Sequence, residues 1–168
     1  TEPLDGPARP GHFAGVATVV TKLLLQTQAD VAVFGEKDYQ QLQVIRTLVR
    51  DLNIPVEIVG APTARAKDGL ALSSRNAYLS ETERTVAAEL GRALTRAAEQ
   101  LHNGVSVELA EPEARPALAA AGFGLVDYLE VRDPVDLSRL GPGRLDRPAR
   151  IFGAAFLGRT RLIDNRAV

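Results

Sequence analysis

The residues best suited to chemistry form a short polar turn, Gly35, Glu36, Lys37 and Asp38, between an apolar run at 31–34 and a helical pattern. The ammonium group of Lys37 can hold a phosphate, and the Asp38 carboxylate can accept a hydrogen bond from a ribose hydroxyl. Asp38 can equally cap the following helix by accepting from the backbone N–H groups of its first turn. The turn therefore indicates either a nucleotide contact or a helix cap with solvated charges.

A second polar stretch within residues 61–79 lacks a periodic apolar pattern and brings two hydroxyls and a guanidinium into consecutive positions. Ser73, Ser74 and Arg75 supply short donors and a planar fork that match phosphate oxygens. A polar linker between domains, with serines that make local side-chain turns, explains the same sequence. The stretch thus indicates either an anion-binding loop or a linker.

Further polar groups stand near the starts of two helical patterns. Arg9 and His12 precede the first, where an arginine at a helix N-terminus can hold a carboxylate or a phosphate. A surface arginine and a capping histidine are the alternative. Gln40 and Gln41 open the second pattern and add amide groups beside the 35–38 turn.

The spacing of apolar residues predicts the elements that position these groups. Helices are expected over residues 12–28, with one broad buried face, and 39–52, and short strands at 31–34 and 56–59. Helix, strand, helix, strand is half of a doubly wound α/β unit, in which ligands lie beyond the carboxyl ends of parallel strands. Because two strands alone leave edges and sheet faces uncovered, we expect the rest of the sheet to come from elsewhere.

From residue 63 onward the pattern predicts a small α+β domain. Ser80 and Glu83 form a capping box that starts a helix running to His102, a residue expected as a helix-end cation rather than a catalyst. The other expected elements are a loop over 1–11, a helix around 106–121 interrupted by Pro112 and Pro116, a strand at 126–131, a loop over 133–148 and a hairpin over 151–163.

Composition narrows the classes of function. Among 168 residues, 45% hydrophobic content is ample for a core, and a net charge of −1 argues against binding to nucleic acid or to an anionic membrane. No apolar run is long enough for a membrane span. The absence of cysteine excludes thiol catalysis and fits the reducing cytoplasm, and two distant histidines argue against a zinc site. A chain without methionine that opens on a proline-rich loop is expected to be part of a longer protein.

Four stretches of the chain carry a more specific signal. They are Arg9-Pro-Gly-His-Phe-Ala-Gly-Val, Phe34-Gly-Glu-Lys-Asp-Tyr-Gln-Gln-Leu, Asp68-Gly-Leu-Ala-Leu-Ser-Ser-Arg-Asn and Thr160-Arg-Leu-Ile-Asp-Asn. In this order and spacing they resemble the pantothenate synthetase (pantoate–β-alanine ligase) family over nearly the whole chain. The resemblance implies a Rossmann-like nucleotide-binding domain, of which residues 1–62 are the C-terminal part, then a small α+β domain over 63–168, and a cytoplasmic homodimer.

The resemblance also implies a reaction and the residues that perform it. ATP, accompanied by Mg²⁺, activates pantoate as pantoyl adenylate with release of pyrophosphate, and β-alanine then displaces AMP. The implied ATP-binding residues are Gly35, Glu36, Lys37, Asp38, Ala64, Leu72, Ser73, Ser74 and Arg75. Of these, Lys37, Ser73, Ser74 and Arg75 are the expected catalytic residues, because adenylate formation needs fixed cations rather than a protein nucleophile. Gln41 is the expected pantoate ligand, with Arg9 and His12 as further candidates, and no direct metal ligand is expected.

The chain departs from the family pattern in two respects. It lacks the earlier half, which carries a His-x-Gly-His phosphate motif, a first pantoate glutamine and acidic magnesium-binding residues, so we expect the chain alone to be inactive. Ala64, Ala66 and Leu72 stand where the family usually has valine, glutamate and methionine. The alternative function is a non-enzymatic nucleotide-binding or dimer-forming module that kept the fold. An upstream His-x-Gly-His motif would favour the enzyme.

Overall fold

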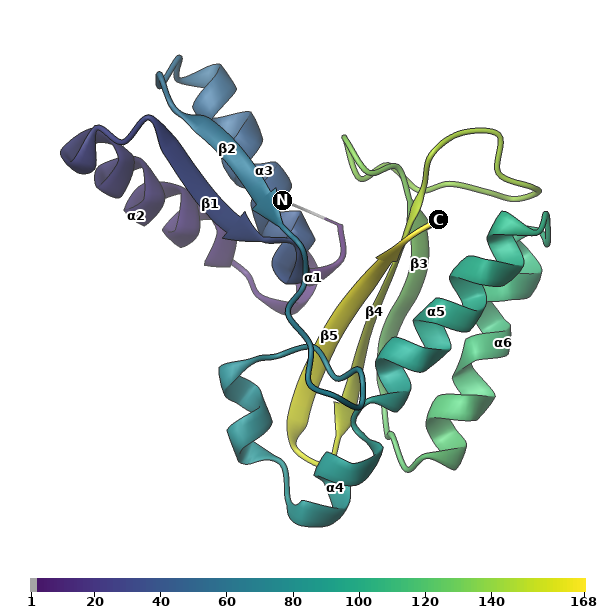
Figure 1. Cartoon of the computed structure of the whole chain (residues 1–168). Helices are drawn as coiled ribbons and strands as arrows, with labels where there is room; N and C mark the ends of the chain where they lie inside the picture. Colours follow the sequence, from purple (N-terminus) through teal and green to yellow (C-terminus); the bar gives the residue numbers. More distant parts are fainter. Residues whose placement is uncertain (1–2) are drawn as a thin grey trace. The chain divides into compact units, whose positions relative to one another are not determined.

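The computed structural model describes residues 3–168, and the chain forms two compact units, one ending at Thr63 and the other covering Ala64–Val168. The first contains a parallel sheet of two strands and the second an antiparallel sheet of three (Figure 1). The prediction of an α/β chain that ends in a small α+β domain is thereby confirmed.

The first unit is a two-stranded parallel sheet with helices on one face. Strand β1 (Val31–Gly35) pairs with β2 (Glu57–Ala61), and helices α2 (His12–Thr27) and α3 (Tyr39–Asp51) precede and follow β1. The small core consists of helix residues Val20, Leu24 and Ile45 and the partly buried strand residues Ala32, Phe34 and Ile58. Since side chains alternate along a strand, these strand residues define the covered face.

The opposite face of this sheet is largely exposed among the residues that the structure describes. Val31, Val33 and Val59 alternate with the core-facing positions and remain 48%, 63% and 36% exposed. Parallel sheets normally have both faces covered, because their strands are apolar on both sides. The unit therefore presents an apolar sheet face that needs a further layer.

Helix α2 is likewise only half covered. Phe13, Val20 and Leu24 are buried, but Val19 and Leu23 are each 52% exposed among the described residues. The prediction that its whole apolar stripe is buried is therefore wrong for this chain. The reason is physical: a sheet of two strands is too narrow to cover a helix face that broad.

A short helix, α1 (Asp5–Ala8), lies where the sequence predicts only a loop over 1–11; Thr1 and Glu2 of that loop lie outside the described residues. The buried amide of Gln40 fixes this helix. Its Oε1 accepts from the Asp5 N–H at 3.0 Å, and its Nε2 donates to the Pro3 carbonyl at 2.6 Å. A contact 35 residues away thus stabilises a turn that local propensity does not predict.

The second unit packs two helices on a β-meander. Strands β3 (Val126–Arg132), β4 (Arg150–Leu157) and β5 (Thr160–Ala167) form the sheet in that order, and the predicted hairpin is confirmed in β4 and β5. Helices α5 (Glu89–His102) and α6 (Val107–Ala120) lie side by side across one face (Figure 1). The largest fully buried side chains at this interface are Leu94, Leu118, Val131 and Ile151.

Gly153 in the middle of β4 permits the close approach of α5. A Cβ atom at this position would lie 3.1 Å from the Cδ2 atoms of both Leu94 and Leu129. Since such contacts are tighter than ordinary van der Waals packing, a side chain here would require these leucine side chains to shift.

Two helix predictions need correction. The capping box at Ser80 and Glu83 is confirmed, but the helix it starts, α4 (Glu81–Val86), ends before α5 begins. Ala87 and Ala88 form the bend between them and are fully buried, so core packing sets a break that the apolar spacing does not encode.

The second correction concerns α6, which continues through Pro112 and Pro116 instead of being interrupted. A tertiary contact holds this helix to the sheet. The buried Glu111 carboxylate accepts from the Val131 N–H at 2.6 Å and from the Arg139 guanidinium. His102 is exposed in the last turn of α5, as predicted.

Candidate functional site

The polar turn that follows β1 lies at the carboxyl end of a parallel strand. Gly35 ends the strand, and the next three residues form a single 3₁₀ turn, η1 (Glu36–Asp38). The Lys37 side chain is only 13% exposed, and its Nζ lies 3.7 Å from an Asp38 carboxylate oxygen. The ammonium group is thus held at the strand end, where α/β sheets receive their ligands.

Asp38 does not cap the helix that follows it. Although it occupies the N-cap position of α3, its carboxylate makes no capping hydrogen bond, so the capping alternative is wrong. Its backbone, at φ −95° and ψ 58°, lies outside the extended region from which N-cap side chains reach back to the helix. The side chain is 49% exposed, which leaves the carboxylate able to accept from a ligand hydroxyl.

The two neighbouring glutamines have different roles in the structure. Gln40 is buried and uses both ends of its amide on backbone groups of α1 and the segment before it. Gln41 is half-buried, and its amide forms no hydrogen bond with any of the residues 3–168. Gln41 can therefore donate to and accept from a ligand, whereas Gln40 holds the fold.

Arg9 and His12 flank the start of α2 in different ways. The N-cap position is Gly11, with φ 75°, rather than His12, whose ring lies 5.1 Å from that of Phe13. Arg9 borders a cavity of about 250 Å³. The lining residues are Gly6, Arg9, Gly11, Phe13, Ala14, Ala17 and Val44. Arg9 thus borders a mainly apolar hollow, and His12 and Gln41 are not among the residues that line it.

The remaining candidates belong to one hydrogen-bonded loop of the second unit, residues 64–76. The Leu72 N–H donates to the Ala64 carbonyl at 2.9 Å, and Arg65 and Ala71 form an isolated antiparallel bridge. Ala64 and Leu72, both implied by the resemblance as ATP-binding residues, are therefore neighbours. The loop therefore has a definite backbone pairing.

The serine–arginine part of loop 64–76 follows directly. Ser73 precedes a 3₁₀ helix, η2 (Ser74–Tyr78), and its hydroxyl accepts from the Arg75 N–H at 3.3 Å. The Asn76 amide closes the base of the loop by donating to the Ala71 carbonyl at 3.1 Å. Ser74 and Arg75 are exposed, so the hydroxyl and guanidinium lie at the surface of the unit. The site candidates are thus grouped within each unit.

One charged cluster behind this loop was missed by the sequence reasoning. Asp164 on β5 is 5% exposed and accepts from both terminal nitrogens of Arg65, at 2.8 and 2.9 Å. Arg65 also donates to the Gly69 carbonyl at 3.0 Å. The available signal was an aspartate that directly follows the apolar pair Leu162 and Ile163, because a buried carboxylate nearly always has a partner.

The turn at Asp68 in the same loop gives a prediction about pH. The hydrogen bond from Arg84, at 2.5 Å, holds the pKa of Asp68 below its ordinary value of 3.8, and the Leu70 N–H adds to this. A carboxyl with a lower pKa in the folded state stabilises the fold above its ordinary pKa, and this contribution is lost as the pH falls towards the folded-state value.

We therefore expect wild type to melt slightly above Asp68→Asn at about pH 7 and this small advantage to shrink as the pH falls below the ordinary pKa of 3.8. Thermal unfolding of both proteins across this range measures it. An advantage that persists or grows in acid would contradict the assigned pair.

Residues 3–168 contain neither a helix suited to cross a membrane nor a cluster of metal-ligating side chains. No helix in this range is both long enough and apolar enough to cross a membrane. Within the same range, no group of three or more histidine, aspartate or glutamate side chains gathers as a possible metal site.

The fold described above recurs in solved pantothenate synthetases. The structure from Thermus thermophilus superimposes with a TM-score of 0.92 at 48% identity, covering 98% of this chain and 59% of that one. A pantoate-beta-alanine ligase from Francisella tularensis, complexed with beta-gamma ATP and beta-alanine, matches with a TM-score of 0.71 at 34% identity over 98% of this chain and 54% of that one.

The sequence relatives of this chain belong to the same class of protein as these solved structures. The family model of pantoate-beta-alanine ligase matches residues 1–167. Pantothenate synthetases from Caulobacter vibrioides and Paramagnetospirillum magneticum are 64% and 59% identical over 100% and 98% of this chain. The chain therefore belongs to the pantoate-beta-alanine ligase family, which confirms the resemblance of the four motifs. It spans 59% and 57% of the lengths of these two relatives.

Proposed function

We propose that this chain is the C-terminal part of an ATP-dependent ligase that joins pantoate to β-alanine through pantoyl adenylate. The observation that carries the proposal is the family match over residues 1–167. A pantoate carboxylate oxygen attacks the α-phosphorus of ATP, and the bond to pyrophosphate breaks. The β-alanine amine then attacks the acyl carbon, loses a proton and releases AMP. The product is pantothenate.

The role of this chain in the first step is electrostatic. Negative charge shifts onto the phosphate oxygens as pyrophosphate leaves, and cations fixed beforehand lower the barrier. Lys37 and Arg75 are the cations that we assign to this role. The hydroxyls of Ser73 and Ser74 donate to phosphate oxygens beside Arg75.

The nucleotide contacts of the proposal use groups with suitable chemistry. Asp38 accepts from a ribose hydroxyl with an exposed carboxylate that is not used in a helix cap. In this proposal Ala64 contacts adenine and Leu72, paired with it through the backbone, leads into the serines that hold the phosphates. Gly35 and Glu36 are further nucleotide contacts. The Francisella relative, complexed with beta-gamma ATP and beta-alanine, supports ATP as the nucleotide.

The proposal also requires a part that this chain does not contain. The relatives are longer, and the exposed sheet face of Val31, Val33 and Val59 is the surface that their further strands and helices would cover. Mg²⁺ enters with ATP, bound to phosphate oxygens and to carboxylates of the further part. A homodimer and a cytoplasmic location, both expected from the family, belong to the same proposal.

The test is ATP–pyrophosphate exchange by the complete enzyme, meaning this chain joined to the N-terminal part that its relatives have. Exchange should require pantoate, and pantothenate should form only when β-alanine is added. Exchange that ignores pantoate, or nucleotide binding without any exchange, would instead favour the non-enzymatic module.

Gln41 gives a prediction specific to pantoate. Gln41→Leu in the complete enzyme should raise KM for pantoate by about tenfold or more, because it leaves ligand oxygens without a polar partner, and should change KM for ATP little. Steady-state titration of each substrate measures the difference. Gln40→Leu is the control: it removes the contacts to Asp5 and Pro3, so its main effect should be a lower melting temperature. Equal losses for both substrates in Gln41→Leu would count against the assignment.

A further inference from the structure

We propose that Asp164 is a positioning residue for the nucleotide, acting through Arg65 on loop 64–76; this rests on the proposed function. Asp164 belongs to the Leu-Ile-Asp-Asn stretch of β5, a motif to which the reaction itself assigns no role. Its carboxylate is buried and lies 99 residues from Arg65 in the sequence, yet the two form a bidentate pair.

Arg65 connects the Asp164 carboxylate to the loop at three points. It follows Ala64 directly, its backbone bridges to Ala71, and its side chain donates to the Gly69 carbonyl at 3.0 Å. Leu72 in turn pairs with Ala64. Fixing the Arg65 guanidinium therefore fixes both sides of the loop base, from which the serines and Arg75 extend.

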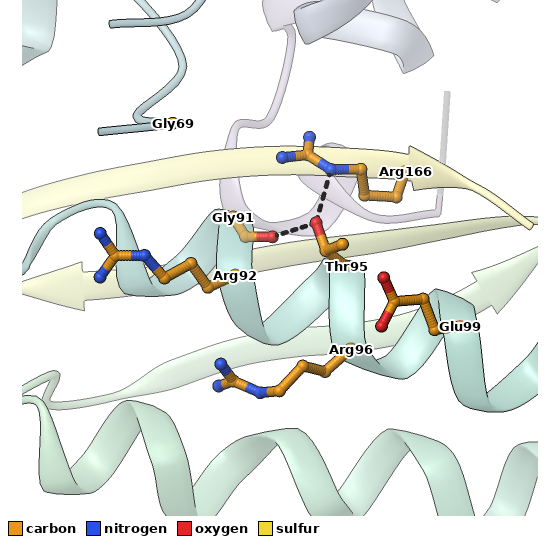
Figure 2. A pocket seen from close by; sticks show the side chains of 7 residues that line it. All are labelled: Gly69, Gly91, Arg92, Thr95, Arg96, Glu99 and Arg166. Atoms are coloured by element: carbon orange, nitrogen blue, oxygen red, sulfur yellow. Dashed lines mark hydrogen bonds between the residues drawn. The ribbon is translucent and has the colours of Figure 1, made fainter. Parts of the chain in front are cut away.

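A second arginine holds Asp164 from the other side. Arg166 donates to both carboxylate oxygens, at 3.3 and 3.5 Å, and its Nε donates to the Thr95 hydroxyl at 3.0 Å. Thr95 in turn donates to the Gly91 carbonyl of α5 (Figure 2). The carboxylate is thus held by groups from the loop, from β5 and, through Arg166, from α5.

Gly91 allows this cluster to form close to the helix. A Cβ atom at this position would lie 3.0 Å from Asp164 Oδ2, 3.3 Å from an Arg166 nitrogen and 3.5 Å from an Arg65 nitrogen. Figure 2 looks into a cavity of about 350 Å³ beside the cluster. It is lined by Gly69, Gly91, Arg92, Thr95, Arg96, Glu99 and Arg166. Gly69 of the loop and Arg166 of β5 thus border the same hollow.

The type of contact favours positioning over simple stabilisation. Removing a carboxylate and its guanidinium partner from water is costly, and well-packed apolar side chains often stabilise a core equally well. A bidentate pair, however, fixes the guanidinium plane and hence the direction of the attached backbone. A loop that holds phosphate groups during their transfer requires a backbone with such a fixed direction.

The experiment compares Asp164→Asn and Arg65→Lys in the complete enzyme with an ion-pair control on the same sheet. The control, Asp127→Asn, weakens the pair between Asp127 on β3 and Arg161 on β5, at 2.6 Å, which does not include Asp164 or Arg65. We expect KM for ATP to rise roughly ten- to a hundredfold in both test variants, while KM for pantoate stays within about twofold. The control should resemble wild type for both substrates.

Hydrogen exchange supplies a readout independent of activity. The amides of Ala66 and Leu72 are hydrogen-bonded within the loop, and their exchange should accelerate about tenfold when the anchor is weakened. If Asp164→Asn does not fold, Arg65→Lys decides, because it retains the charge at a partly exposed position. The inference is overturned if hydrogen exchange of the loop amides and KM for ATP are both unchanged. It is also overturned if KM rises equally for ATP and for pantoate. If the wild-type complete enzyme shows no ATP–pyrophosphate exchange, the proposed function is refuted. Hydrogen exchange of the loop amides would still decide whether Asp164 anchors the loop.

Discussion

Arg75→Ala and Lys37→Ala should each lower pantoate-dependent pyrophosphate release by the complete enzyme by about 10²–10³, equivalent to about 3–4 kcal/mol of barrier. Both side chains carry a positive charge that we assign to the phosphates as they separate. A cation that acts only as the charge develops affects turnover more than nucleotide binding. Pyrophosphate release under saturating substrates is therefore the appropriate measurement.

The fold should survive these changes. Arg75 is exposed, and its guanidinium forms no ion pair or hydrogen bond with the part of the chain that the structure describes. Arg147→Ala is a matched control, since it removes the same charge from an exposed position in the same unit, where Arg147 pairs with Asp146 at 3.5 Å. Activity of Arg75→Ala within a few-fold of wild type would refute the assignment. A large fall in melting temperature would make the residue structural instead.

Local sequence features predicted much of the fold for a clear reason. The apolar spacing of α3 and the glycine after β1 are properties of neighbouring residues, so the strand, turn and helix around Lys37 followed from the sequence. The capping box at Ser80 is equally local, and both of its hydrogen bonds form. The same reasoning placed the 35–38 turn at the carboxyl end of a strand, although the ligand contacts of its residues remain predictions.

Features set by distant partners could not be predicted. The helix at Asp5–Ala8 depends on Gln40, the bend at Ala87 depends on core packing, and the anchor of Arg65 lies at Asp164. In each case the deciding contact joins residues far apart in the chain, which periodicity does not reveal. The choice between helix cap and ligand contact at Asp38 also needed backbone dihedral angles, which the residue types alone do not give.

The largest expected effect concerns residues 1–168 produced alone, which should make no pantoyl adenylate. Lys37 and Arg75 supply only part of the phosphate contacts, and the His-x-Gly-His motif expected from the family lies outside this chain. Without opposing donors the triphosphate is not held in line with an incoming carboxylate, and the advantage of orientation is lost. ATP–pyrophosphate exchange should be at background with pantoate present.

The exposed apolar surfaces also predict that the isolated chain associates with itself. Val31 and Val33 on the sheet, and Val19 and Leu23 on α2, are about half exposed or more, and the two-stranded sheet has open backbone edges. Such surfaces favour association between chains, so the isolated chain should elute as oligomers or aggregate in size-exclusion chromatography. Val33→Thr keeps the side-chain shape and the β propensity while reducing the apolar character, and should shift elution towards the monomer.

Supplying the N-terminal part of a relative in trans tests both defects together. If the added part covers the exposed sheet face and brings the missing phosphate donors, solubility and pantoate-dependent exchange should return in the same mixtures and with the same concentration dependence, because one association event restores both. Arg75→Ala in the chain serves as the control, since it should recover solubility without recovering exchange. Vigorous exchange by residues 1–168 alone would overturn this account, because a complete phosphate site would then lie within the chain.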